Sequence, residues 1–147
     1  QLFDIFLNFK EAYGVTILFI THNLSAANYL CDRVGVLYKG HLVELGRSQE
    51  ILTRPYHPYT MALLDAVPKF GRCDIPTDFG TLQRQFEGGD ESLGCPFFKR
   101  CQRAKMVRCS NELPVLLEVE PGHFSSCFYG KEIHKEVMES AACRLGI

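Results

Sequence analysis

A continuous apolar run with a helical pattern on either side is the feature that most constrains the fold. The run VTILFI covers residues 15–20 and shows no alternation of polar and apolar side chains. Such a run is typical of a strand buried on both faces of a sheet that helices cover. It is far shorter than the roughly 20 residues that a membrane-spanning helix needs. The chain is therefore expected to contain part of an α/β domain.

Helix and strand patterns alternate around this run. Before it, apolar residues recur at helical spacing up to Gly14, namely Leu2, Ile5, Phe6 and Phe9. After it, a short helix is expected over residues 25–31. The segments RVGVLY and HLVELG then flank Lys39-Gly40, which predicts a β-hairpin.

Two more helices are expected before residue 69. The first follows Ser48, which we expect to serve as its N-cap. The second begins at Pro58, the favoured first position of a helix, and carries an apolar face made of Met61, Leu64 and Val67. The alternation of helix and strand supports an α/β architecture for residues 1–69.

The sequence changes character after residue 69. Turn-forming segments such as EGGDESLG replace the periodic patterns until about Pro114. PVLLEVE and HFSSCFY then flank Pro121-Gly122, which predicts two short strands joined by a turn. A terminal helix follows, with Ile133, Val137, Ala141 and Leu145 at four-residue spacing. We therefore expect two parts, an α/β part over residues 1–69 and a small irregular extension over residues 70–147.

Composition excludes some classes of function. The formal net charge of -1 provides no excess positive charge for nucleic acid. No apolar run approaches the length of a membrane span, so any membrane association is expected to run through a partner. The chain begins with Gln1 and has no recognisable leader, and we expect it to be a piece of a longer protein.

His22 follows the apolar run directly. Ligands of open parallel sheets bind beyond the carboxyl ends of the strands. A histidine that directly follows a strand, as His22 does, is therefore expected to lie near a bound substrate. Taken alone, a single histidine at such a position also fits a structural role.

Four cysteines form the second chemical feature, Cys95, Cys101, Cys109 and Cys127, separated by 5, 7 and 17 residues. This spacing is neither the paired pattern of zinc ribbons nor a ferredoxin run, so it does not identify a particular metal. Basic residues surround the first three, and we expect them to lower the thiol pKa values and to offset the charge of bound thiolates. Metal ligation, two disulfides and buried small hydrophobes all remain open. The odd total of seven cysteines weakens a purely disulfide interpretation.

The stretch ILFITHNLSAANYLCDRVGVLYKGHLVELG resembles the end of the nucleotide-binding domain of ABC transporters. The elements that carry the resemblance are His22, Asp32-Arg33-Val34, Lys39-Gly40 and the V-E-x-G strand at residues 43–46. RPYHPYTMALLDAVP, residues 54–68, resembles the stretch that marks the oligopeptide and dipeptide permease branch. Together the two resemblances cover nearly all of residues 1–68.

The resemblance implies a role for His22 as the switch histidine that hydrogen-bonds the γ-phosphate of ATP and helps to hold the attacking water. The family usually has Asp at the next position, where this chain has Asn23. The phosphate-binding loop and the catalytic glutamate are not found in these residues, so this stretch is expected not to hydrolyse ATP by itself. The resemblance also implies ATP and Mg in the full-length subunit, a second ATP-binding subunit, and transmembrane permease partners at the cytoplasmic face of the membrane.

GCPFFKRC and the later PGH and Cys127 resemble the C-terminal extension of oligopeptide and dipeptide ATPase subunits. In that branch the four cysteines can hold a [4Fe-4S] cluster, which implies ligation by Cys95, Cys101, Cys109 and Cys127. Zinc is the second alternative and two disulfides the third. A stand-alone metal-binding module or a disulfide-stabilised interaction domain are the competing functions. Outside this set, Cys31 is expected to pack, and Cys73 and Cys143 are candidates for free thiols. His123 could replace a thiolate as a ligand, but a role in the turn after Pro121-Gly122 is favoured.

Overall fold

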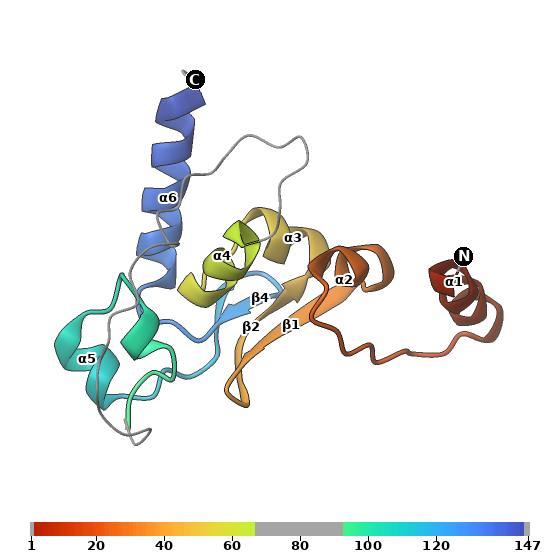
Figure 1. Cartoon of the computed structure of the whole chain (residues 1–147), viewed down its shortest axis with the longest axis horizontal. Helices are drawn as coiled ribbons and strands as arrows, with labels where there is room; N and C mark the ends of the chain where they lie inside the picture. The colour runs from red at the N-terminus through yellow and green to blue at the C-terminus, as the bar shows by residue number, and fades with distance from the viewer. Residues whose placement is uncertain (1, 67–92, 146–147) are drawn as a thin grey trace.

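The computed structural model describes residues 2–66 and 93–145, which form six helices, a short 3-10 turn and four strands (Figure 1). The helices are α1 (Leu2–Tyr13), α2 (Leu24–Leu30), α3 (Ser48–Thr53), α4 (Pro58–Asp65), α5 (Met106–Asn111) and α6 (Gly130–Leu145), and the 3-10 turn is η1 (Phe98–Arg100). The strands are β1 (Arg33–Tyr38), β2 (His41–Arg47), β3 (Leu117–Glu120) and β4 (His123–Ser125).

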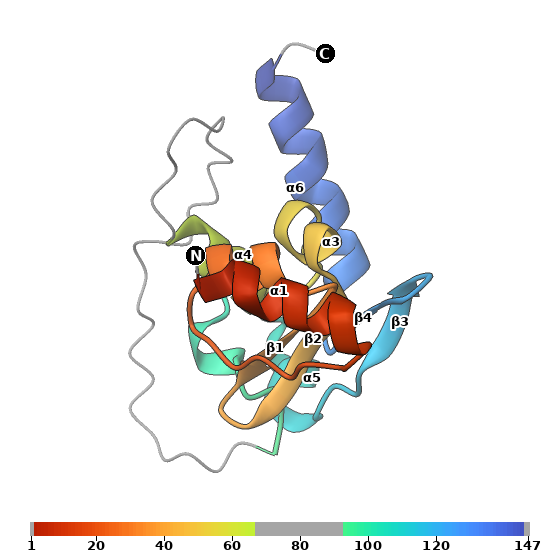
Figure 2. The ribbon, with the colours of Figure 1, turned by 90° about the vertical axis from the view of Figure 1, so that its right-hand side faces the viewer.

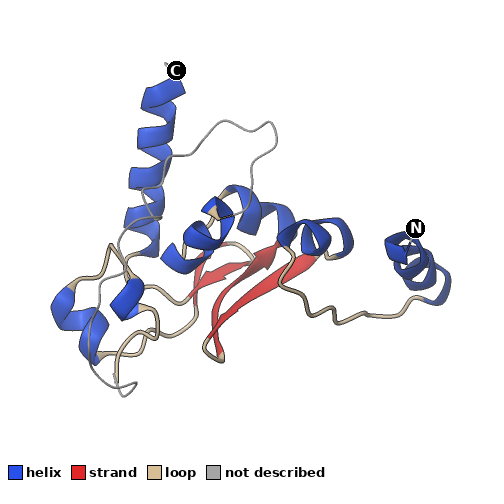
Figure 3. Ribbon diagram, viewed as in Figure 1, coloured by secondary structure: helices blue, strands red, loops and turns tan. Residues whose placement is uncertain are grey.

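The four strands form one antiparallel sheet in the order β1-β2-β4-β3 (Figure 3). The β1–β2 turn has positive φ at both Lys39 and Gly40, the backbone that suits the twist of a tight hairpin. At the other hairpin, proline fixes φ at Pro121 and Gly122 takes a φ of +78°. Both predicted hairpins are therefore confirmed, and local turn chemistry accounts for them.

Strands from both sides of the predicted boundary share this sheet. β2 pairs with β4, which places Glu44 opposite Ser125 and Leu45 opposite Phe124. The core crosses the boundary as well, because Phe97 and Cys101 pack with Val36, Tyr38, Val43 and Ile51. The boundary between residues 69 and 70 falls outside the described residues, and the division into 1–69 and 70–147 stays a prediction.

Helices α2, α3 and α4 lie along one side of the sheet, whereas α6 projects away from it (Figures 1 and 2). α4 begins at Pro58 as predicted, and Met61 is buried and Leu64 half-buried, while Val67 lies outside the described residues. The prediction for Ser48 was wrong: Arg47 is the N-cap of α3 and Ser48 is the first helical residue. Ser48 instead donates its amide N–H to the Asp32 carbonyl and its hydroxyl to the Asn28 amide oxygen.

Residues 2–31, which we call the arm, differ from the rest of the described chain, which we call the body. Helix α1 forms as predicted, but the expected strand at residues 15–20 does not: these residues have no regular secondary structure, and Leu18 and Ile20 are 87% and 88% exposed. A parallel strand takes its backbone hydrogen bonds from neighbouring strands, and none of the four described strands pairs with this segment. In the described part of the chain, no helix is long and apolar enough to span a bilayer.

Candidate functional site

All four predicted ligands, Cys95, Cys101, Cys109 and Cys127, line a single cavity of about 20 Å³. Its other walls are mainly aromatic and apolar, with Phe97, Phe98, Phe128, Ile133, His57 and Pro58 among them. Cys101 and Cys109 are buried, and Cys95 and Cys127 are half-buried. Four cysteines spread over residues 95–127 thus line the same small cavity.

Close backbone approach holds the first three cysteines together. The Cys95 amide donates to the Cys109 carbonyl at 2.9 Å, and the Cys101 amide donates to the Phe98 carbonyl at 3.2 Å, which closes η1. Gly94 makes the first contact possible, because a Cβ at this position would lie 2.4 Å from the carbonyl oxygen of Cys109. The glycine therefore brings the segment that carries Cys95 against the end of α5.

Cys127 reaches the cavity from the sheet. Just before it, Ser126 donates its amide N–H to the Val43 carbonyl at 2.8 Å and its hydroxyl to the Pro114 carbonyl at 2.7 Å. Just after it, α6 begins, and Ile133 on its first turns is buried against the same cavity. The fourth thiol is therefore held between the β2–β4 pairing and α6.

Burial governs the acidity of these thiols. It raises the pKa of Cys101 to about 11 and that of Cys127 to about 12, and it also raises the pKa of Cys95. The neighbouring thiols raise these pKa values further, since like charges in one cavity oppose ionisation. The expectation that nearby basic residues lower the thiol pKa values was wrong, because the small lowering by Arg103 at Cys101 is outweighed by burial.

The basic side chains point to other partners. Lys105 pairs with Glu132 and lies 3.9 Å from the centre of the Tyr129 ring. Arg108 lies 4.0 Å from the centre of the Phe128 ring, and Arg103 pairs with Glu136 of α6. Phe128 and Tyr129 line the cavity, so Arg108 and Lys105 lie over two of its aromatic rings, and Arg103 lines the cavity itself.

The cavity lining includes four thiols, donors of the kind that thiolate-bound metals use. Backbone N–H groups near three of the sulfurs act to lower the pKa values of Cys95, Cys101 and Cys127, but burial outweighs them. As they stand, no three His, Cys, Asp or Glu side chains of the described residues are arranged to hold one metal ion. The four thiols share the cavity without converging on a single point.

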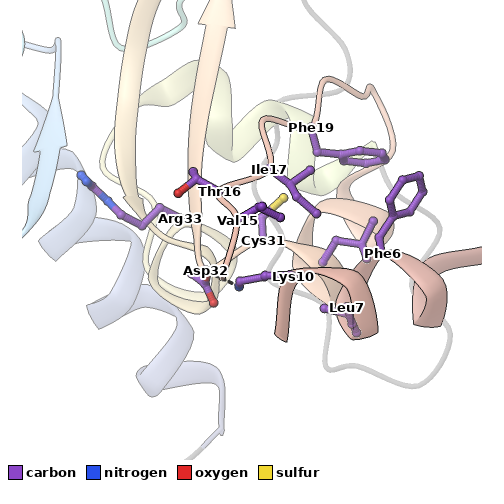
Figure 4. A pocket seen from close by; sticks show the side chains of 11 residues that line it. Phe6, Leu7, Lys10, Val15, Thr16, Ile17, Phe19, Cys31, Asp32 and Arg33 are labelled. Atoms are coloured by element: carbon purple, nitrogen blue, oxygen red, sulfur yellow. Dashed lines mark hydrogen bonds and ion pairs between the residues drawn. The ribbon is translucent and has the colours of Figure 1, made fainter. Parts of the chain in front are cut away.

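The remaining predicted residues lie elsewhere. Cys31 is half-buried beside a separate cavity of about 280 Å³ between α1 and residues 15–17, where Lys10 pairs with Asp32 at the edge (Figure 4). The prediction for Cys73 lies outside the described residues, and so does the one for the Cys143 side chain. His123 is not a wall residue of the four-cysteine cavity. It has a structural role of a different kind, described next.

Sequence reasoning did not identify a buried network centred on Glu44. This side chain has no exposed surface, and its Oε1 accepts from His123 Nε2 at 2.7 Å and from the Tyr56 amide at 2.6 Å. Its Oε2 accepts from the His57 amide at 3.1 Å. The V-E-x-G, HPYT and PGH motifs thus meet at one carboxylate. The only signal in the sequence was a charged residue on a strand between apolar neighbours.

His22 lies on the exposed segment that leads into α2. Asn23 accepts the Ala26 amide at 3.1 Å and so caps this helix, as expected for an asparagine at that position. The Asn23 amide in turn donates to the Thr21 hydroxyl at 3.0 Å. His22 lies on the arm and is not among the residues that line the cavity of the four cysteines.

Comparison with known proteins agrees with these motifs. Residues 43–109 match a family described as the oligopeptide/dipeptide transporter, C-terminal region. A putative peptide import ATP-binding protein of Brucella ovis is 38% identical over 133 residues, which cover 86% of this chain and 40% of that protein. The oligopeptide transport ATP-binding protein AppF of Bacillus subtilis is 34% identical over 135 residues, covering 86% of this chain and 39% of AppF.

The matched region and the mixed α/β fold define the class as the C-terminal part of an ABC-transporter ATP-binding subunit. Within that class, the chain belongs to the oligopeptide/dipeptide family. It spans about 40% of the length of the curated relatives that it matches.

Proposed function

We propose that the whole protein is the ATP-hydrolysing subunit of an importer for oligopeptides or dipeptides. The observation that carries this proposal is the match of the chain to peptide import and oligopeptide transport ATP-binding proteins over 86% of its length. In this role the subunit binds ATP and Mg, works with a second ATP-binding subunit, and drives transmembrane permease subunits from the cytoplasmic face of the membrane. The described residues supply the end of the nucleotide-binding part.

His22 is assigned the role of the switch histidine in this proposal. A ring nitrogen that hydrogen-bonds the γ-phosphate helps to align the attacking water, and phosphoryl transfer depends mainly on such positioning. In the whole protein, His22→Ala should lower the rate of ATP hydrolysis about 100-fold or more while ATP still binds. Hydrolysis at the wild-type rate would remove His22 from the mechanism.

The four-cysteine site is proposed to hold a [4Fe-4S] cluster, with zinc as the alternative. The four thiols that line one small cavity support this assignment. Bound metal would cross-link the segments that carry Cys95, Cys101, Cys109 and Cys127 and would offset the cost of ionising buried thiols. The group therefore has a structural or regulatory role in this proposal.

The test is anaerobic purification followed by quantification of iron, sulfide and zinc and by a visible spectrum. Iron and sulfide in equal amounts support the cluster, and one zinc per chain supports the alternative. Cys101→Ser should abolish metal loading, whereas Cys143→Ser, a matched change outside the predicted ligand set, should not. Equal loading of the two variants would show that the ligands are assigned wrongly.

A disulfide-stabilised interaction domain is the rival function from a different class. It predicts a metal-free, colourless protein whose free thiols are lost on non-reducing analysis. A stand-alone metal-binding module, the other rival, predicts metal loading without any ATPase activity in the whole protein. Metal content and ATP hydrolysis measured on the same preparation separate these three functions.

A further inference from the structure

A groove of about 840 Å³ lies between the arm and the body. Leu7 and Lys10 of α1 and the end of α2 form one wall, and the start of α3 forms the other. Among the described residues, none lines both this groove and the four-cysteine cavity. The volume falls in the range of about 300 to 1,000 Å³ that is typical of pockets for small ligands. The groove is therefore a separate candidate for a binding site.

Two arginines occupy opposite positions of the β1–β2 hairpin and line this groove. Arg33 of β1 is directly paired with Arg47 of β2 in the antiparallel register. Within the described part of the chain neither arginine forms an ion pair, and the neighbouring Asp32 pairs instead with Lys10, on the side away from which the Arg33 guanidinium points (Figure 4). Like charges directly opposite each other destabilise a sheet. An anion bound between the two guanidinium groups would remove this repulsion.

Glu50 adds the opposite charge to the same groove. It lies in the first turn of α3, close in sequence to Arg47, and it lines the groove. Its Oε2 atom is buried and has no hydrogen-bond partner within the described residues. A buried carboxylate oxygen without a donor costs free energy, and the N–H groups of a ligand amine would satisfy it.

These charges discriminate between classes of ligand. Water and salt screen exposed arginines, and such a pair by itself would accept any anion. The Glu50 carboxylate would repel the phosphates of a polyanion such as a nucleotide. A ligand that carries one anionic and one cationic group, in contrast, satisfies the two arginines and Glu50 together.

The remaining lining suits a peptide. Asn28 and Gln49 contribute side-chain amides, which are suited to hydrogen bonds with peptide groups. Leu7, Leu30 and Phe124 contribute apolar surface for the side chains of a ligand. A short peptide with free ends has its amino group at one end, its carboxylate at the other, and peptide groups between them. Its chemistry therefore matches both the charged and the uncharged parts of the groove.

We infer that this groove binds a short peptide with free ends, whose carboxylate lies between Arg33 and Arg47 and whose amino group meets Glu50. The inference rests on the proposed function for its biological meaning, since a subunit of a peptide importer would thereby bind the imported product at the cytoplasmic face of the membrane. The groove joins α2 to α3, and α2 begins two residues after His22. Bound peptide therefore stabilises the position of α2 on the body, and with it the segment that carries His22.

The first test is isothermal titration calorimetry of the whole protein with trialanine and with two capped forms of this peptide. N-acetyl-trialanine lacks the amino charge and trialanine amide lacks the carboxylate. Each should bind about tenfold or more weakly than trialanine, the loss expected for one charge-assisted hydrogen bond. Glu50→Gln should remove the preference over the acetylated form, and Arg47→Gln should remove the preference over the amide. Arg100→Gln is the matched control, because this arginine is exposed and does not line the groove.

The second test is hydrogen exchange, measured by mass spectrometry with and without trialanine. Exchange should slow in α2 and in residues 47–50, where the ligand joins the two walls of the groove. It should not change in β3, which contributes no residue to the lining. Equal slowing in β3 would report a general effect of the peptide and would count against the inferred site.

The outcomes separate this inference from the proposed function. Absence of trialanine binding, or equal binding of its three forms, would overturn the inference, while ATP hydrolysis by the same preparation would still support the proposed function. Inorganic phosphate that binds as tightly as trialanine would also overturn it, since the groove would then be a simple anion site. Peptide binding with the expected preferences in a protein that does not hydrolyse ATP would support the inference and count against the proposed function. If Arg47→Gln does not fold, loss of the same preference in Arg33→Gln supports the inference, and an unchanged preference overturns it.

Discussion

The arm and the body differ in what they leave exposed and what they bury. Helix α1 of the arm has no buried residue, and Leu2, Ile5 and Leu18 are 64%, 62% and 87% exposed. The body, in contrast, buries polar side chains: Glu44 and His123 have no exposed surface. Apolar side chains in water and polar side chains in the core are the reverse of the usual distribution.

The two regions reach this state for different reasons. In the body, each buried polar group that Glu44 meets is a hydrogen-bond donor, so the cost of removing the carboxylate from water is offset. In the arm, the described residues offer no surface that covers α1 and residues 15–20. The interactions that hold the body therefore lie within it. In the arm, α2 packs against the body through the buried Ala26 and Ala27, whereas α1 is held by surface contacts such as the Tyr29–Asp4 hydrogen bond and the Lys10–Asp32 ion pair.

The same substitution should have very different effects in the two regions. Gly94→Ala places a Cβ 2.4 Å from backbone atoms at residues 109 and 110, which cannot move without breaking the Cys95–Cys109 contact. The expected loss is about 3 kcal/mol in the free energy of unfolding, with rapid hydrogen exchange at residues 94–109. Urea denaturation and exchange measured by mass spectrometry test this.

Gly14→Ala is the matched change in the arm. Gly14 has a φ of +62° at the end of α1, but nothing lies within 4 Å of an added Cβ. Only the backbone strain of about 1 kcal/mol should appear, as fraying of α1. Slowed refolding or faster exchange in the body of this variant would contradict the independence of the two regions.

Removing one negative charge should also separate the regions. Glu44→Gln replaces a carboxylate that accepts three N–H groups by an amide that must turn its own N–H₂ toward one of them. The expected cost is about 2 kcal/mol in the free energy of unfolding. Asp32→Asn breaks the exposed Lys10–Asp32 ion pair between the arm and the body, and no measurable change in the unfolding midpoint is expected from it. If both variants lose the same amount of free energy of unfolding, the burial of the Glu44 carboxylate does not add to stability.

Local patterns predicted much of the fold. The hairpin at Lys39-Gly40, the start of α4 at Pro58 and the turn at Pro121-Gly122 depend on a few adjacent residues, and all three form. The run at residues 15–20 failed because a strand needs partners that a sequence pattern does not contain. The short helix α5 was not predicted at all, since its six residues give too few turns for periodicity to show.

Non-local contacts could not be predicted in the same way. Resemblance indicated that the four cysteines act together, and the shared cavity is consistent with that grouping. The Glu44–His123 bond joins residues 79 positions apart, and no periodicity reports such a contact. We expected the basic residues near the cysteines to lower the thiol pKa values, and this was wrong. Closeness in sequence does not show that Arg103 and Lys105 form ion pairs with Glu136 and Glu132.

The smallest effect should be seen in the titration of two tyrosines, one in each region. Burial and a hydrogen bond to Glu120 raise the pKa of Tyr56 to about 12, whereas the pKa of Tyr29 in the arm is raised mainly by its hydrogen bond to Asp4. A raised pKa means that the folded state keeps a proton that the unfolded chain releases. The contribution of Tyr56 to stability is therefore complete below pH 10 and is lost as the pH rises toward about 12.

Two carboxylate variants test whether burial or a charged neighbour is the cause. Asp4→Asn should return the pKa of Tyr29 to its ordinary value, because the largest causes of that shift both come from Asp4. Glu120→Gln should leave the pKa of Tyr56 well above its ordinary value, because burial is the largest cause there. Tyrosinate absorbance, with Tyr29→Phe and Tyr56→Phe to assign each transition, measures both. A complete return of Tyr56 in Glu120→Gln would mean that water reaches this ring as freely as it reaches the arm.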